Sequence, residues 1–108
     1  MSYEVFFQWA HETGMRILEN EKYEEKKGID LLKRLIFDIR SEETPGRFLG
    51  KLSERLTEYK TNVNIQADVS LNRKIFEGEW QGDSFYYLKS AILSGFLNAL
   101  STKERRRR

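Results

Sequence analysis

Cysteine is absent from this chain, and proline and histidine each occur once. Without cysteine there is no disulfide framework, thiol nucleophile or thiolate metal site. The single histidine, His11, lies in no His-Glu-x-x-His pattern, and a metal site or a general base needs partner residues. A phosphate-binding Gly-x-x-x-x-Gly-Lys-Ser/Thr loop is also missing. We therefore predict that the protein is not an enzyme and uses no metal, cofactor or small-molecule substrate.

Long apolar runs are missing as well. The most apolar stretch, residues 85–100, is interrupted by a lysine, two serines and an asparagine, and it is too short and too polar to cross a bilayer. Residues 1–4 have neither the basic region nor the apolar run of a signal peptide. We expect a soluble, cytoplasmic protein that does not contact membranes.

The composition is that of one folded domain. The 108 residues suffice for one modest core, and 39% hydrophobic with 13% aromatic residues exclude intrinsic disorder. Charged residues make up 33%, but the net charge is only +2 and four positive charges lie in Arg105–Arg108. Any argument for nucleic-acid binding must therefore rest on local patches rather than on total charge.

Apolar residues recur at three- and four-residue steps in four segments, which predicts helices over residues 2–20, 28–40, 45–60 and 83–101. Thr44-Pro45 is a helix-start signal. Between these segments we interpret residues 21–27 as a charged connector or an early helical turn, 61–70 as a loop or a short extended piece, and 71–76 as an optional short fifth helix. The predicted fold is all-α: a compact bundle of four main helices forming one domain over residues 1–102, followed by a disordered basic tail over 103–108.

The apolar stripes also predict the core. The inward-facing positions are Phe6, Trp9, Ala10, Thr13, Ile17, Ile29, Leu32, Leu35, Ile36, Ile39, Phe48, Leu49, Leu52, Leu56, Tyr59, Phe85, Leu88, Ile92, Phe96 and Leu100. Leu31 and Phe37 broaden the stripe of the second helix, and Gly14 allows close helix packing. Trp80, between two glycines, is either a core plug or an exposed anchor, and the first is favoured. Phe7 lies off its stripe and could meet a partner.

Basic residues form a row on the third predicted helix. Arg47, Lys51 and Arg55 follow one another at four-residue steps and therefore share a helix face, which could track a phosphate backbone. The second helix could extend this surface with Lys26, Lys27, Lys33, Arg34 and Arg40. The alternative is an ordinary solvated exterior, in which Glu54 pairs with Arg47 or Lys51 and Asp30 pairs with Arg34. The residues alone favour this alternative.

Three segments together resemble a known family. They are Ile29-Asp30-Leu31-Leu32-Lys33-Arg34-Leu35, then Arg47-Phe48-Leu49 with residues 52–59, and finally Phe85-Tyr86-Tyr87-Leu88 with residues 92–97. The arrangement resembles the C-terminal helical domain of the large subunit of type I-B CRISPR Cascade complexes. In related systems that domain is also made as a separate small subunit by internal translation initiation, which a start at Met1 would suit. The resemblance covers about residues 25–100 and consists of hydrophobic spacings; residues 62–80 depart from it.

The resemblance implies a non-catalytic small subunit of Cascade. Such a subunit lines the complex, holds the displaced non-target DNA strand and supports the guide–target heteroduplex through backbone contacts. The nucleic-acid-binding residues it implies are Lys33, Arg34, Arg40, Arg47, Lys51 and Arg55. The implied partners are single-stranded DNA, the backbone of the guide RNA–DNA hybrid, other Cascade subunits and further copies of this chain. The competing hypothesis is a protein-interaction or regulatory helical module without a nucleic-acid role, in which Phe7, Trp9 and Trp80 are exposed anchors.

Overall fold

The structure, a computed structural model, describes residues 3–19, 24–59 and 83–106. They form four helices: α1 (Tyr3–Leu18), α2 (Glu25–Arg40), α3 (Pro45–Glu58) and α5 (Asp83–Arg106). No strand occurs in these three ranges, and the predicted all-α class is confirmed. The loop or extended piece expected at 61–70, the short helix expected at 71–76 and the turn around Trp80 lie outside the described residues.

Two helices are longer than the sequence predicted. α2 begins at Glu25, so residues 25–27 form the early helical turn that was one of the two alternatives for this segment, and the Gly28 N–H donates to the Glu24 carbonyl at 3.0 Å. α5 continues to Arg106, so residues 103–106 belong to the last helix and not to a disordered tail. Lysine, glutamate and arginine are good helix formers, and cations near a helix C-terminus complement its dipole, which explains the extension.

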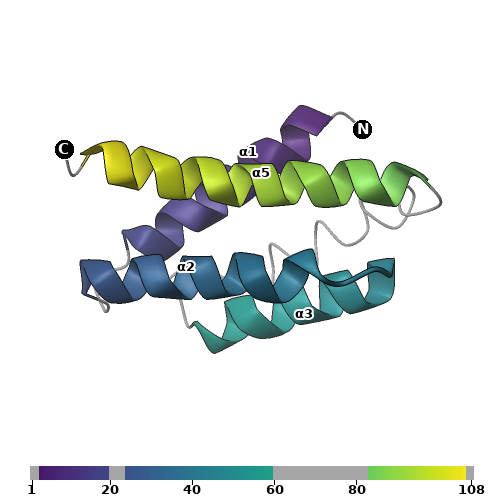
Figure 1. The fold of residues 1–108 in the computed structure, drawn as a ribbon, viewed down its shortest axis with the longest axis horizontal. Coiled ribbons are helices and arrows are strands. Elements are labelled where there is room, and N and C mark those ends of the chain that lie inside the picture. Colours follow the sequence, from purple (N-terminus) through teal and green to yellow (C-terminus); the bar gives the residue numbers. More distant parts are fainter. Residues whose placement is uncertain (1–2, 20–23, 60–82, 107–108) are drawn as a thin grey trace.

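The helices pack around one apolar core. In Figure 1, α1 crosses behind α5, α2 runs below α5, and α3 lies along α2. Among the predicted core positions only Trp9, Ile36 and Leu49 are partly exposed, and the other core positions are buried. Phe37 was expected to broaden the buried stripe of the second helix, but 62% of its surface is exposed.

Glycines let α1 and α5 approach closely. A Cβ atom on Gly95 of α5 would lie 2.6 Å from the Ala10 Cβ and 2.9 Å from the His11 backbone nitrogen of α1. A Cβ on Gly14 would lie 2.8 Å from the Ala99 Cβ. The prediction that Gly14 allows close packing is confirmed. The more demanding contact, at Gly95, was not anticipated.

Two contacts hold α5, one against the turn between α2 and α3 and one against the start of α3. The Lys89 ammonium donates to the Glu42 carbonyl at 2.7 Å, and the rings of Phe48 and Phe85 meet edge-on with their centroids 5.9 Å apart. These contacts join α3 to the rest of the bundle from one end. Within the described residues, no helix combines the length and the apolarity that crossing a bilayer requires.

Candidate nucleic-acid interface

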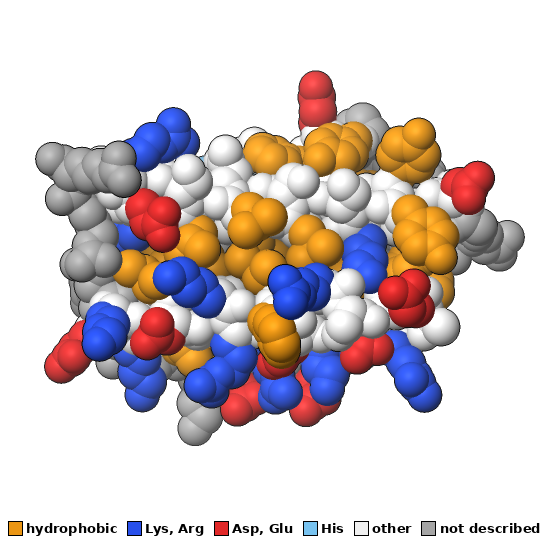
Figure 2. Space-filling view, in the orientation of Figure 1, with side chains coloured by type: hydrophobic (Ala, Val, Ile, Leu, Met, Phe, Trp, Pro, Cys, Tyr) orange, Lys and Arg blue, Asp and Glu red, His pale blue; other side chains and the backbone are white. Residues whose placement is uncertain are grey.

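The six predicted binding residues lie on two neighbouring helices. Lys33, Arg34 and Arg40 project from α2, and Arg47, Lys51 and Arg55 project from α3. Lys51 and Arg55 are partly buried, and the other four are exposed. Figure 2 shows lysine and arginine side chains gathered over the half of the molecule that α2 and α3 occupy in Figure 1, with acidic side chains between them.

The three cations of α2 lie on two different faces of that helix. Lys33 and Arg40 are two turns apart on one face, with Phe37 between them, and the Arg40 guanidinium carbon lies 4.7 Å from the centre of the Phe37 ring. Arg34 follows Lys33 by one residue and is therefore rotated about 100° around the helix. It lines a hollow between α2 and α3 together with Arg55. The six residues thus do not form one continuous row.

Arg55 is held by carboxylates from both helices. Its Nε donates to the Asp38 Oδ2 of α2 at 2.8 Å and its Nη1 donates to the Glu58 Oε2 at 2.9 Å, while Glu54 lies 3.8 Å from Nη1. The hydrogen bond to Asp38, followed by that to Glu58, raises the pKa of Arg55. These acids offset the positive charge at the C-terminal end of the predicted row. Because Asp38 lies on α2, its ion pair with Arg55 joins α3 to α2.

The other five cations differ from Arg55, because none of them forms an ion pair with a described residue. The expected pairing of Glu54 with Arg47 or Lys51 is wrong, since Glu54 lies against Arg55 instead. The expected pair of Asp30 with Arg34 does not form either. Five of the six predicted residues thus keep a positive charge that no described carboxylate offsets directly.

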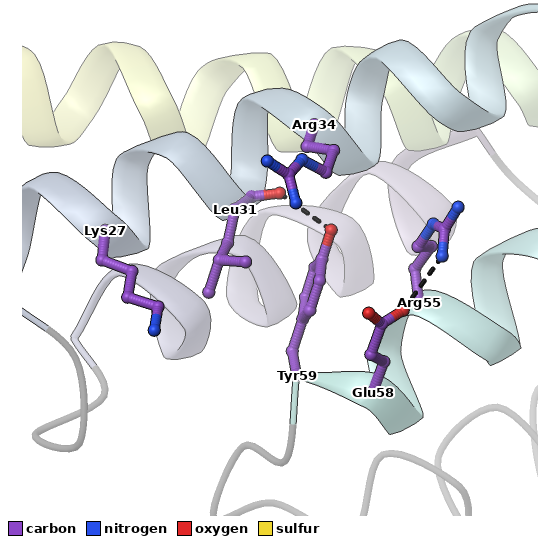
Figure 3. A pocket seen from close by; sticks show the side chains of 6 residues that line it. All are labelled: Lys27, Leu31, Arg34, Arg55, Glu58 and Tyr59. Atoms are coloured by element: carbon purple, nitrogen blue, oxygen red, sulfur yellow. Dashed lines mark hydrogen bonds and ion pairs between the residues drawn. The ribbon is translucent and has the colours of Figure 1, made fainter.

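A partly open hollow of about 270 Å³ separates α2 from α3. It is lined by Lys27, Leu31, Arg34, Arg55, Glu58 and Tyr59, which Figure 3 shows extending from the two facing helices. The Tyr59 hydroxyl donates to the Leu31 carbonyl at 3.0 Å. The sequence did not predict this hollow, because residues 21–27 were left as either a connector or an early helical turn. Once α2 begins at Glu25, the steps of four and three residues from Lys27 to Leu31 and Arg34 place all three on one face.

Tyr59 makes stability depend on pH in the alkaline range. Burial, with a smaller contribution from the charge of Asp38, raises the pKa of Tyr59 to about 12, whereas a tyrosine in the unfolded chain ionises near ~10. The folded state therefore holds a proton that the unfolded state loses. The contribution to stability is complete below pH ~10 and is lost as the pH rises towards 12, by at most about 2–3 kcal/mol.

Urea denaturation measured from pH 9 to pH 12 checks this expectation. Lysines also titrate in this range, so the informative quantity is the difference between the protein and Tyr59→Phe. The variant loses the hydrogen bond to Leu31, at a cost of about 1 kcal/mol at pH 9. Its stability should then fall less steeply towards pH 12. Parallel curves for the two proteins would contradict the raised pKa.

The remaining candidates for chemistry lie on α1. His11 is partly buried, and its Nδ1 is buried without a hydrogen-bond partner among the described residues. A shallow depression is lined by Glu4, Val5, Gln8, Trp9 and Glu12, and the Gln8 amide donates to Glu12 at 2.9 Å. In the described ranges, no three histidine or carboxylate side chains gather in a way that could hold a metal ion.

The expected aromatic anchors are not the most exposed apolar residues. Trp9 is partly buried and meets the Phe96 ring edge-on at 6.3 Å, and Phe7 stacks on Tyr3 at 6.4 Å. Trp80 lies outside the described residues. Among the residues that the structure describes, the exposed large hydrophobic ones are Tyr3, Val5, Phe37, Tyr86, Tyr87 and Leu97. All except Phe37 lie outside the predicted apolar stripes, which is the signal that could have identified them.

No known protein family, curated protein or solved structure matches this chain. The fold and the surface therefore define its class by themselves. The class is a helical bundle whose α2 and α3 carry all six predicted binding cations, with a small charged hollow between these helices.

Proposed function

We propose that this protein is a non-catalytic subunit that binds the backbone of nucleic acid through α2 and α3. The observation that carries the proposal is the group of five cations without a described carboxylate partner, namely Lys33, Arg34, Arg40, Arg47 and Lys51. Such cations can displace the counterions that surround phosphates, and this release drives binding regardless of base sequence.

The particular assembly that we propose is a type I, I-B-like, CRISPR Cascade complex. The resembling segments, residues 29–35, 47–59 and 85–97, belong to α2, α3 and α5, and α2 packs against both other helices. In this role the subunit would hold the displaced non-target strand and support the guide–target heteroduplex. Base pairing by the guide RNA would read the sequence, so the subunit would need backbone contacts only.

Binding of a fluorescent oligothymidylate, titrated at several salt concentrations, tests the proposal. We expect the logarithm of the affinity to fall linearly with the logarithm of the salt concentration. Replacing Lys33 and Arg40 together by alanine should weaken binding and reduce the slope by about 0.7 for each phosphate that the variant no longer neutralises.

The matched control is Arg16→Ala, which removes an exposed cation from α1. It should change the affinity far less than the Lys33→Ala, Arg40→Ala double variant. Equal losses in the two variants, or no binding at low salt, would contradict a strand-binding surface on α2.

The second candidate function is a protein-interaction or regulatory module without a nucleic-acid role. The exposed Phe37 on α2 and the exposed Tyr86 and Leu97 on α5 favour it, because aromatic residues are enriched at protein interfaces. Co-purification with a protein partner but without nucleic acid, lost on changing Tyr86 and Leu97 to serine, would support this function over the first.

A further inference from the structure

The hollow between α2 and α3 is lined by basic side chains from both helices. We infer that it binds the phosphate group of a nucleotide, with Lys27 and Arg34 of α2 and the free edge of Arg55 of α3 as donors. The inference deepens the proposed function and rests on it for the source of the phosphate, the backbone of a bound strand. A free nucleotide offers the same phosphate chemistry, and the experiment below separates the two sources.

Cations from both helices line the hollow. Figure 3 shows Lys27, Leu31 and Arg34 following one another along α2, with the Tyr59 side chain between Leu31 and the α3 residues Glu58 and Arg55. Arg34 forms no ion pair with a described residue. Lysine binds a phosphate as a compact point charge, whereas arginine offers two parallel N–H donors. A phosphate between the helices could therefore be held by donors from two sides.

Arg55 is oriented before any ligand arrives. Asp38 holds its Nε at 2.8 Å and Glu58 holds its Nη1 at 2.9 Å, so the guanidinium plane is fixed from both helices. Its Nη2 has no hydrogen-bond partner among the described residues. A side chain that is already ordered loses little conformational entropy on binding, so this free edge is a favourable donor.

The charges around the hollow and its volume limit which ligands it can hold. Three cations line the hollow, while Glu58 lines it and Asp38 reaches it through Arg55. Glu54 also lies 3.8 Å from the Arg55 Nη1, so three carboxylates balance the three cations, and an anion must compete with Glu58 for Arg55. The volume of about 270 Å³ lies at the lower limit for small-molecule sites. It can take a phosphate and part of a nucleoside against the apolar wall of Leu31.

The test follows backbone amide shifts by NMR while three probes are added: inorganic phosphate, thymidine monophosphate and oligothymidylate. We expect all three to shift amides around Lys27–Arg34 and Arg55–Tyr59. Arg34→Ala should weaken thymidine monophosphate binding by about tenfold. Glu58→Gln should strengthen it, because the competing carboxylate is removed while a side chain of the same shape remains. Damage to the fold cannot produce such a gain.

The control is Arg16→Ala, which removes an exposed cation from α1, away from the hollow, and should leave thymidine monophosphate binding unchanged. Equal losses in Arg16→Ala and Arg34→Ala, or weaker binding in Glu58→Gln, would overturn the inference. Tighter binding of oligothymidylate than of thymidine monophosphate at the hollow supports a strand as the source, and the reverse order supports a free nucleotide.

The inference and the proposed function fail in distinguishable ways. If oligothymidylate binds in a manner sensitive to Lys33 and Arg40 while no probe shifts the amides of the hollow, the inference is overturned and the proposed function stands. If thymidine monophosphate binds at the hollow while oligothymidylate does not bind at all, the phosphate site is supported and the strand-binding function is overturned.

Discussion

Gly95→Ala is expected to destabilise the protein by about 3 kcal/mol, although alanine is the better helix former by about 1 kcal/mol. The new methyl group would meet the Phe7 carbonyl, the Ala10 Cβ at 2.6 Å and the His11 backbone nitrogen at 2.9 Å. Two of these neighbours are main-chain atoms, which cannot rotate away. α1 would have to shift as a whole, and the rings between α1 and α5 would pack less closely. Urea denaturation followed by far-ultraviolet circular dichroism measures the loss of stability.

Gly50→Ala is the control for this prediction. It makes the same substitution in α3, at an exposed position where a Cβ would meet nothing within 4 Å. Helix propensity then decides the outcome, and we expect stabilisation by about 0.5–1 kcal/mol. If the two substitutions changed stability in the same direction, the close approach of α1 to α5 at Gly95 would be contradicted.

Phe48→Ala should lower the free energy of unfolding by about 3–5 kcal/mol. The Phe48 side chain is fully buried, and it packs edge-on against Phe85. Truncation leaves a cavity where α3 joins α5 and removes an aromatic pair worth about 1 kcal/mol beyond its buried area. Because domains of this kind have only about 5–15 kcal/mol of stability in total, the variant should unfold at markedly lower urea concentration.

The same substitution at an exposed ring provides the comparison. Phe37→Ala removes a side chain that is 62% exposed, and we expect a change within about 0.5 kcal/mol. Similar losses of stability at the two positions would contradict the burial of Phe48. A combined change of Phe48 and Phe85 should cost less than the two single changes added together, since the rings touch each other.

Periodicity predicted the helices and most of the core because each buried stripe is a local property of its helix. The start of α2 was placed near Gly28, with an early helical turn before it left open, because a glycine resembles a helix boundary. In the structure this glycine lies inside the helix, where a Cβ would come within 3.3 Å of the Ile17 carbonyl of α1. A contact between two helices gives no signal in the sequence around the glycine. The end of α5 was misjudged because its charged residues were interpreted as a tail.

The sequence predicted which residues belong to the candidate site, but not how they are arranged in space. The partner that fixes Arg55, Asp38, is seventeen residues away on α2, so the pair depends on how α2 and α3 pack together. The same packing creates the hollow that Arg34 lines. Phe37 was expected to broaden a buried stripe, whereas helices α1, α3 and α5 leave its side of α2 uncovered.

The crossing of α1 over α5 also affects how the chain folds as it is synthesised. α1 makes its most extensive contacts with α5 and fewer with α2, so it lacks its main partner until α5 has left the ribosome. α2 and α3 are neighbours in sequence and can pair earlier, since closing a short loop costs little entropy. During that interval the apolar face of α1, with Phe6 and Ile17, is exposed to solvent and to other chains. The close approach at Gly95 is therefore among the last features to form.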